Sequence, residues 1–254
     1  MTATLEELTR HLDGYLHIAE LPDDRRALNG LQLENSGRVT RILGAVDACQ
    51  ATIDAAAERH ADLLLVHHGL FWGGLQAAVG RHGRRLRALI SHDIALYSAH
   101  LPLDRHPEVG NNAVLARALG VEALEPFGRA DGEREIGWAG PLELPLAELV
   151  GRIERRLGVP PLRVVATGPD PLRRVAVVTG AGSGLLAEAR DRGIDTLVTG
   201  EGPHHAYFDA EEWGLNLILA GHYASETVGV QALGAHLAER FGLPFEFFDH
   251  PTGL

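Results

Sequence analysis

A buried strand that ends in two adjacent histidines is the feature that most constrains this chain. Residues 62–69 read Asp-Leu-Leu-Leu-Val-His-His-Gly, so an apolar run leads directly into His67 and His68. Such a run is typical of a buried strand, and ligands of open α/β sheets bind where these strands end and open into loops. Two neighbouring imidazoles would repel each other if charged and need partners if neutral. A metal ion would account for the pair, and an ordinary pair of hydrogen-bonded histidines is the alternative.

Strand and helix patterns alternate along the 254 residues. In the first half we expect helices over 4–19, 48–60, 86–92 and 111–119, and strands over 39–46, 63–66 and 94–99, with a loop over 73–83. Residues 29–32, Asn-Gly-Leu-Gln, are a turn signal that leads to a short extended segment. After an irregular stretch over 120–135 we expect helices over 146–157, 185–192, 204–213 and 227–241, and strands over 136–144, 164–167, 173–179, 196–199, 217–220 and 244–248. This alternation predicts an α/β fold with mixed, mostly parallel sheets between layers of helices.

The two halves repeat one arrangement, which indicates an internal duplication. In the first half, His100 follows a predicted strand and Asp104 comes four residues later. In the second half, His222 follows a predicted strand and Glu226 comes four residues later. Chance produces one such pair easily, but two at matching places are harder to explain by chance. We therefore expect two related three-layer α/β halves, residues 1–125 and 126–254, with a metal site between them.

Imidazoles and carboxylates are the groups that this pattern places at the carboxyl ends of strands. Nitrogen and oxygen ligands without a thiolate suit divalent zinc, manganese or iron. Two such ions a few ångströms apart polarise a phosphoryl or carbonyl oxygen and lower the pKa of water. His204 and His205 also follow a strand end, so they either line the site or support its ligands. Several unrelated histidines are the alternative explanation for a set that comprises His67, His68, His100, Asp104, Glu201, His222 and Glu226.

A glycine-rich turn over residues 179–184, Thr-Gly-Ala-Gly-Ser-Gly, lies between a predicted strand and a predicted helix. Its backbone amides are candidates for a cradle that binds a phosphate. The glycine spacing is not that of a dinucleotide-binding turn, and the chemistry of a tight turn is the competing explanation.

The composition excludes several classes of site. All 23 basic residues are arginine, which excludes a P-loop lysine and a Schiff-base lysine. The single cysteine, Cys49, excludes an intramolecular disulfide and a multi-cysteine zinc site. A net charge of −11 argues against nucleic acid as a general partner. No apolar signal region or membrane-length run occurs, so we expect a cytoplasmic protein with no membrane partner.

Four motifs, in order along nearly the whole chain, carry a family resemblance. They are residues 67–69 (His-His-Gly), 98–104 (Ser-Ala-His-Leu-Pro-Leu-Asp), 200–205 (Gly-Glu-Gly-Pro-His-His) and 221–226 (Gly-His-Tyr-Ala-Ser-Glu). Together with residues 29–32 and 180–184, they resemble the YbgI-like dinuclear-metal family, whose members are often labelled GTP cyclohydrolase 1 type 2 homolog. The chain is similar to the short form, which lacks an inserted middle domain.

This resemblance implies two related α/β halves, a toroidal homohexamer and two divalent metal ions per chain, with zinc favoured over manganese or iron. It implies that His100 supports the ligands or binds occasionally, whereas the pattern in the residues ranks His100 equal to His222. Pro102 departs from the polar residue that relatives often carry there, although the spacing to Asp104 is kept. The metal ligands that the resemblance implies are His67, His68, Asp104, His222 and Glu226.

Two classes of function stay open at this point, and the sequence leaves open whether the protein is an enzyme. The first is a metal-dependent hydrolase acting on a nucleotide or phosphorylated small molecule, by ring opening as in a GTP cyclohydrolase or by phosphoester hydrolysis. Its candidate proton-transfer groups are His100, Glu201 and His205. The second is a non-enzymatic metal-binding, metal-delivery or regulatory protein. A DNA-associated ring fits poorly with the net charge.

Overall fold

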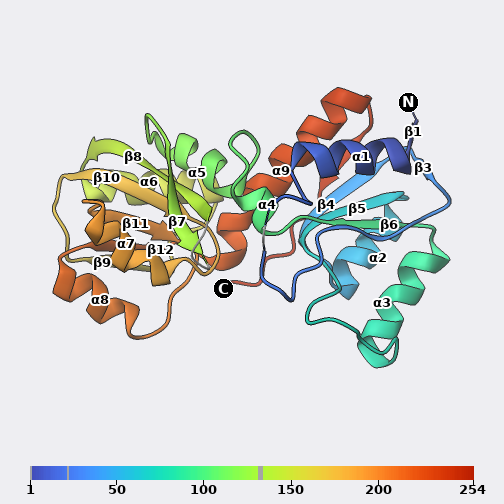
Figure 1. The fold of residues 1–254 in the computed structure, drawn as a ribbon, viewed down its shortest axis with the longest axis horizontal. Coiled ribbons are helices and arrows are strands. Elements are labelled where there is room, and N and C mark those ends of the chain that lie inside the picture. The colour runs from blue at the N-terminus through green and yellow to red at the C-terminus, as the bar shows by residue number, and fades with distance from the viewer. Residues whose placement is uncertain (1, 22, 131–133) are drawn as a thin grey trace. The chain divides into compact units, whose positions relative to one another are not determined.

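A computed structural model describes residues 2–21, 23–130 and 134–254, which form two compact units (Figure 1). Unit 1 comprises Met1–Leu103 and Val230–His250, and unit 2 comprises Asp104–Gly229 and Pro251–Leu254. Two helices, α4 (Leu101–Asp104) and α9 (His222–Phe241), contain residues of both units. No helix within the described ranges is both long and apolar enough to cross a membrane. The predicted division of the chain after residue 125 stays a prediction.

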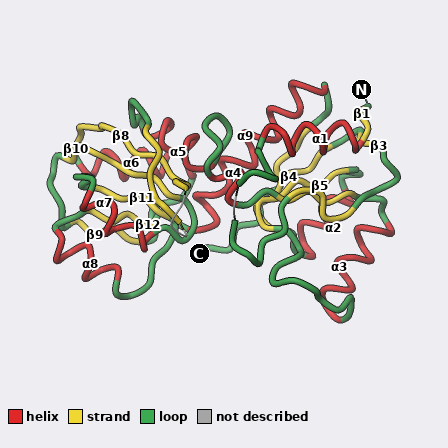
Figure 2. The backbone as a smooth tube through the Cα atoms, viewed as in Figure 1, coloured by secondary structure: helices red, strands yellow, loops and turns green. Residues whose placement is uncertain are grey.

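Unit 1 is built on a five-stranded sheet with helices on both faces. Its elements are β1 (Ala3–Thr4), α1 (Leu5–Tyr15), β2 (Gly30–Leu33), β3 (Arg38–Val39), β4 (Ile42–Asp47), α2 (Gln50–Glu58), β5 (Leu63–His68), α3 (Gly80–Ser91), β6 (Ala95–Ser98) and β13 (Phe245–Phe247). The strand order is β13, β4, β5, β6, β2, in which the first four strands are parallel and β2 runs antiparallel to β6. Figures 1 and 2 show α2 and α3 on one side of this sheet and α1 on the other.

Alternating side chains of the central strands build a core on each face of this sheet. On the α1 face, the buried Tyr97 of β6 donates its hydroxyl hydrogen to Asp13 of α1 at 2.8 Å. On the other face, fully buried side chains of β4, β5 and β6 pack against α2 and α3, and each contributes about 1.5–3 kcal/mol by leaving water. They belong to a cluster that includes Leu43, Ile53, Leu64, Leu89 and Leu96.

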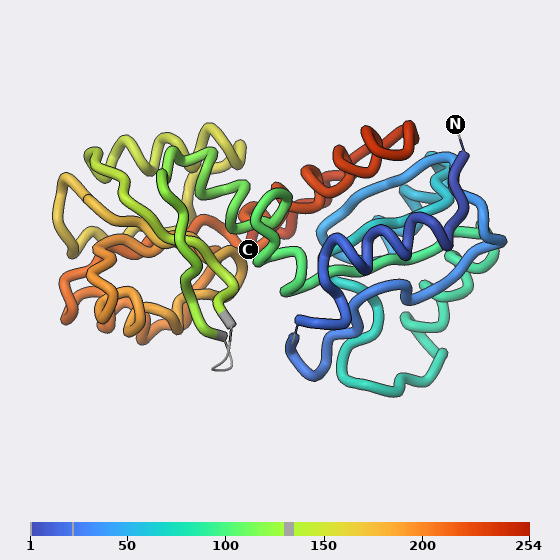
Figure 3. Tube along the Cα trace, turned by 45° about the horizontal axis from the view of Figure 1, so that its top comes forward, coloured from blue at the N-terminus to red at the C-terminus, as the bar shows by residue number. Residues whose placement is uncertain are grey.

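Helix α9 contributes to unit 1 by two contacts with distant parts of the sequence. Figure 3 shows α1, in dark blue, beside the C-terminal part of α9, in red. The Nε2 atoms of His11 and His236 are 2.9 Å apart there, and Tyr15 stacks on His236. The ring of Phe245 fills the space between Gly44 and Gly234, where an added Cβ would lie 2.7 Å and 2.0 Å from ring carbons. Glycine is therefore required at both positions for this ring to pack.

Unit 2 is built on a six-stranded mixed sheet. Its elements are α5 (Asn111–Leu119), β7 (Glu125–Ala130), β8 (Arg134–Leu144), α6 (Leu146–Leu157), β9 (Arg163–Ala166), β10 (Leu172–Val178), the 3-10 helix η1 (Ser183–Leu185), α7 (Leu186–Asp191), β11 (Thr196–Thr199), α8 (Ala206–Trp213) and β12 (Asn216–Leu219). The strand order is β7, β8, β10, β11, β12, β9, in which β10, β11 and β12 are parallel and the other neighbours pair antiparallel. One hydrophobic cluster packs α5 and α6 against the sheet, and a second packs α7 and α8 against it.

The two units share one topology, which supports the internal duplication. In unit 1 the parallel strands β4, β5 and β6 are followed in the sheet by the antiparallel β2, and in unit 2 β10, β11 and β12 are followed by the antiparallel β9. A pair of aspartates repeats as well. Asp62, just before β5, accepts from the amides of Thr40 and Arg41, and Asp195, just before β11, accepts from those of Arg173 and Arg174. The predicted fold class is confirmed.

Four predicted details of the secondary structure are wrong. β5 extends through His68, so both histidines end the strand and do not follow it. Helix α3 begins at Gly80 within the predicted loop over 73–83, and β7 occupies Glu125–Ala130 of the predicted irregular stretch, of which residues 131–133 lie outside the described ranges. Helix α9 begins at His222 and not at Thr227, so His222 and Glu226 lie on its first turns.

The Phe245 packing gives a first testable prediction. Replacing Gly234 by Ala is expected to lower the free energy of unfolding by about 1–3 kcal/mol, because the new methyl group would occupy the space of the ring. This loss outweighs the gain of about 1 kcal/mol that alanine brings to a helix interior. Chemical denaturation of both proteins measures the difference.

Gly14 of α1 provides the matched control, because an added Cβ there meets nothing within 4 Å. Gly14→Ala is expected to stabilise the protein by up to about 1 kcal/mol. Stabilisation by both substitutions would contradict the packing argument.

Candidate metal centre

Three imidazoles converge at the carboxyl ends of β5 and β6 in unit 1. His67 and His68 end β5, and His100 follows β6, which is parallel to it. The ring centroids lie 4.6–5.6 Å apart, and one ring nitrogen of each histidine lies within 4.8 Å of one from each of the others. This spacing suits nitrogen ligands that share a divalent ion, because each would bind it at about 2.0–2.1 Å.

Each of these imidazoles is fixed by a hydrogen bond from its Nδ1. His67 donates to the carbonyl oxygen of Ala99 at 2.8 Å, and His68 donates to Asp47 Oδ1 at 2.9 Å. His100 donates to Asp23 Oδ1 at 2.8 Å. Because carbonyl and carboxylate oxygens only accept, Nδ1 carries the proton and the lone pair of each neutral ring lies on Nε2. A fixed tautomer with an oxygen partner behind it is the arrangement that proteins use to orient metal-binding histidines.

Asp23 is the functional residue that the sequence reasoning missed. Burial raises its pKa, but hydrogen bonds from His100, Asn29 and the amide of Asp24 outweigh that effect and hold the pKa below its ordinary value. It therefore stays ionised as the acceptor for His100. Asp23 lies far from His100 in the sequence and in no regular element, so no local signal pointed to it.

The ring of Trp72 lies beside the imidazole cluster. The Trp72 ring lies 5.0 Å from that of His100 and 6.0 Å from that of His68, between centroids. Its indole N–H donates to the carbonyl oxygen of Gly69 at 3.0 Å, which fixes the ring. Trp72 therefore shields one side of the cluster and lies close enough to report on an ion bound there.

In unit 2, His222 lies between two carboxylates. Its Nδ1 is 3.0 Å from Glu201 Oε1, and its Nε2 is 3.2 Å from Glu226 Oε1, one helical turn away on α9. The hydrogen bond with Glu226 raises the pKa of His222 to about 9, against the opposing effect of burial, and Glu201 adds to the rise. In the absence of a cation, a proton on His222 thus balances the carboxylates, and a divalent ion would compete with that proton.

The end of β10 brings Asp104 and Glu226 to the same strand terminus. The buried Asp104 accepts from Asn111 Nδ2 at 2.9 Å and from Thr179 Oγ1 at 3.3 Å, both at Oδ1. The next residue, Gly180, has a φ of +64°, and an added Cβ would lie 2.4 Å from Glu226 Oε1. Glycine is needed here because any side chain would displace the Glu226 carboxylate.

Side-chain acceptors occupy part of the glycine-rich turn that is the predicted phosphate cradle. The amides of Thr179, Gly180 and Gly182 donate to Asn112 Oδ1, Ser225 Oγ and Thr199 Oγ1. These hydrogen bonds tie the turn to its neighbours and occupy three of its six amides. The turn shapes the site around Glu226, which agrees with the alternative of tight-turn chemistry.

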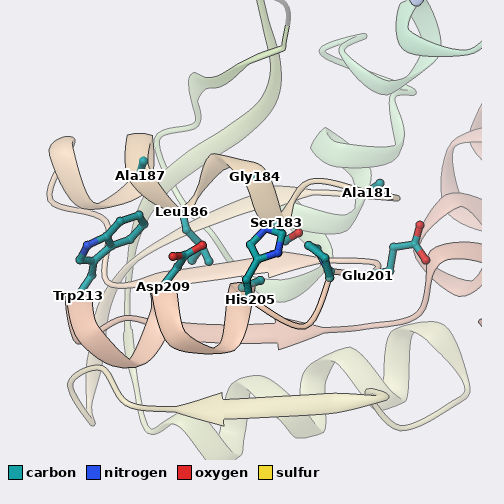
Figure 4. Close-up of a pocket in the computed structure, with 12 residues that line it drawn as sticks. Ala181, Ser183, Gly184, Leu186, Ala187, Glu201, His205, Asp209 and Trp213 are labelled. Atoms are coloured by element: carbon teal, nitrogen blue, oxygen red, sulfur yellow. The ribbon is translucent and has the colours of Figure 1, made fainter.

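A cavity of about 510 Å³ opens beside these groups in unit 2 (Figure 4). Glu201 lines it and is also the hydrogen-bond partner of His222. His205 lines it as well, whereas its neighbour His204 does not. The predicted proton-transfer residues Glu201 and His205 therefore line the same cavity.

Comparison with known proteins places the chain among close relatives. The family profile described as Duf34/NIF3 (NGG1p interacting factor 3) matches residues 3–252. A Deinococcus radiodurans protein named GTP cyclohydrolase 1 type 2 homolog is 49% identical over 253 residues, which cover 98% of this chain and 94% of the relative. The crystal structure of a Thermus thermophilus protein matches with a TM-score of 0.91 and 47% identity over 99% of this chain and 100% of that one. Protein ybgI, described as of unknown function, matches with a TM-score of 0.90 and 38% identity over the same shares.

The fixed tautomers in unit 1 predict that Asp47, which would not touch the metal but accepts from His68, affects the affinity for metal. Co²⁺ is expected to quench the fluorescence of Trp72, and Asp47→Ala, which releases the His68 ring, is expected to weaken Co²⁺ binding about 10–100-fold. Trp72→Phe should abolish most of the quenching, because the Trp72 ring lies 6.0 Å from that of His68 and 5.0 Å from that of His100. Asp54→Ala removes a carboxylate of α2 that accepts from Gln50, and it should leave the Co²⁺ affinity unchanged. Equal losses in both aspartate variants would contradict the orienting role of Asp47.

The raised pKa of His222 predicts how stability depends on pH in metal-free protein. The folded-state value of about 9 lies above the ordinary 6.5, so protonated His222 stabilises the fold. This contribution, on the order of 2 kcal/mol, is fully present below about pH 6.5 and is lost as the pH rises to about 9. Unfolding in a chelator between pH 6 and 10 should show the loss in the wild type and not in His222→Gln. His204→Gln, which removes an exposed histidine, should keep the wild-type profile.

Proposed function

The chain belongs to the Duf34/NIF3 family, and we propose that it is a dinuclear divalent-metal hydrolase acting on a nucleotide or phosphorylated small molecule. The relatives' name, GTP cyclohydrolase 1 type 2 homolog, supports GTP as the first substrate to test. The observation that carries the proposal is the convergence of three imidazoles whose tautomers are fixed by Nδ1 hydrogen bonds. Imidazoles held by Nδ1 in this way direct Nε2 to a shared point, which is the arrangement that proteins use for histidines that bind a divalent ion.

The proposed ligands combine nitrogen and oxygen donors. Unit 1 supplies imidazoles in the metal-binding tautomer, and unit 2 supplies carboxylates next to a histidine whose proton a cation would replace. This mixture without thiolates favours zinc, with manganese and iron as the other candidates. The five proposed ligands of the two ions are His67, His68, Asp104, His222 and Glu226.

Bound divalent ions supply Lewis-acid chemistry, in which they polarise a phosphoryl or carbonyl oxygen and lower the pKa of water. The residues of this chain position the substrate and move protons. Glu201 is the proposed general base, because its carboxylate lines the cavity while it accepts from His222. His205, which lines the same cavity, is the proposed donor to the leaving group, and His100 supports the imidazole cluster through Asp23.

We also propose that the protein works in the cytoplasm as a toroidal homohexamer. Three large apolar side chains of unit 1 support self-association, because their exposure to water is costly in a monomer. Leu75, Val79 and Ile90 are 107%, 71% and 65% exposed.

Metal content and turnover test the proposal together. Elemental mass spectrometry of protein purified without added metal is expected to give about two ions per chain. The double variant His67→Ala, Glu226→Ala should lose them. The loaded wild type should hydrolyse a member of a panel of nucleotides and phosphoesters that begins with GTP, and the double variant should lose at least about 100-fold in kcat/KM.

His92→Ala, Glu212→Ala provides the matched control, because it removes one exposed histidine and one exposed glutamate outside the cluster. It should retain both metal and activity. Metal binding without turnover of any panel member would contradict the hydrolase and favour a metal-delivery or regulatory protein. A wild type that takes up no metal would contradict the dinuclear centre itself.

A further inference from the structure

The cavity beside Glu201 has a chemical character that selects its ligand. Its volume of about 510 Å³ lies in the range of small-molecule sites. One wall is a face of α8, because His205, Asp209 and Trp213 follow one another at intervals of four residues. Figure 4 shows these three side chains pointing to the same side of the helix.

The opposite wall is formed by small residues, whose short side chains leave space for a ligand. Gly184 of η1 and Ala187 of α7 lie there, and Gly202 closes the end near Glu201. An added Cβ at Gly202 would lie 2.9 Å from Ser183 Oγ, so this corner is already tightly packed. The free space therefore extends along the α8 wall, between Glu201 and Trp213.

The charges that line this space are negative. Glu201 and Asp209 contribute carboxylates, and within the described ranges no arginine lines the cavity. Arg190 lies over the Trp213 ring at 4.6 Å, but its guanidinium is paired with Asp191 at 2.7 Å. A phosphate or carboxylate would meet like charge here, so the space suits a group with N–H donors or a positive charge.

Asp209 and Trp213 together favour a flat ligand. Among the described residues, no side chain donates a hydrogen bond to the Asp209 carboxylate, so both of its oxygens face water or a ligand. Two carboxylate oxygens match a pair of adjacent N–H groups, and an indole attracts flat rings and cations. Ser183, His205 and Asp209 also line the cavity, but no hydrogen bond joins them in the described part of the chain, so they form no nucleophilic triad.

We propose that this cavity binds a planar ring with an amidine-like edge, with the ring against Trp213 and its adjacent N–H groups on the Asp209 carboxylate. The assignment names the substrate class of the metal-dependent reaction and rests on the proposed function. It places the ring of the substrate in the cavity and keeps any phosphate groups outside it.

Calorimetric titration with benzamidine and benzoate tests the assignment, because the two probes share size and shape but differ in charge and in N–H donors. Full-length protein is expected to bind benzamidine at least about 10-fold more tightly than benzoate. Asp209→Asn should weaken benzamidine binding about 5–10-fold, and Trp213→Ala should weaken it to a similar degree. Glu212→Gln makes the same charge change on the same helix, outside the cavity, and should leave the affinity unchanged.

A second pair of probes tests the edge itself. Guanosine carries two adjacent N–H groups, whereas inosine lacks the exocyclic amine, so guanosine is expected to bind about 3–10-fold more tightly. Asp209→Asn should remove this difference. Equal binding of benzamidine and benzoate, or an unchanged affinity in Asp209→Asn, would overturn the assignment.

All of these titrations are repeated in a chelator and with saturating Zn²⁺, so that the two proposals fail separately. Probe binding without metal uptake or turnover would leave the cavity assignment standing and contradict the hydrolase. Metal uptake and turnover without selective benzamidine binding would leave the hydrolase standing and contradict the cavity assignment.

Discussion

The hydrogen bond that each unit 1 imidazole donates through Nδ1 is the interaction on which the candidate site depends. A free imidazole exchanges its proton between two nitrogens and rotates about two bonds, so it presents a ligand atom only part of the time. Two of the three accepting oxygens are fixed by the sheet, since Asp47 ends β4 and the Ala99 carbonyl follows β6, and the third belongs to Asp23 in a loop. The register of parallel strands thus sets the geometry of the ligands, and the apolar core beneath them holds that register.

In unit 2 the site depends on how the charge of the buried Glu226 carboxylate is balanced. A buried carboxylate such as Glu226 is costly unless a positive charge faces it, and in the metal-free state His222 supplies that charge by keeping its proton. The absence of a side chain at Gly180 makes room for this carboxylate, because an added Cβ would lie 2.4 Å from Glu226 Oε1. A divalent ion would take over the role of the proton, so metal binding and proton release are linked at this position.

The sequence predicted most strand ends to within one or two residues, because short apolar runs that stop at polar residues mark them directly; β5 runs on through His67 and His68. The bounds of α5 and α6 were also predicted, since glycine follows each of these helices. The first turn of α3 was missed because Gly80 and Gly83 are typical of loops. Strand β7 was missed because Pro126 and Gly128 disfavour a strand, but β7 lies at the edge of its sheet, where a proline costs no ladder hydrogen bond. Asp23 was unpredictable, because its role depends on a tertiary contact with His100 and not on any local pattern.

The duplication explains why His100 and His222 are not equivalent. The amide of Ala99 donates to the Val66 carbonyl in unit 1, and the amide of Ala220 donates to the Thr199 carbonyl in unit 2. Ala99 therefore corresponds to Ala220, and the next residue, His100, corresponds to Gly221. The match of His100 with His222 in the sequence is therefore one residue out of register with the structural alignment of the two units. The ends of the central strands have diverged as well. Val66 of β5 is followed by His67 and His68, whereas Thr199 of β11 is followed by Gly200 and Glu201. Imidazoles bind a cation without adding charge, whereas carboxylates also offset its charge, so the two copies present different kinds of ligand at the ends of their central strands.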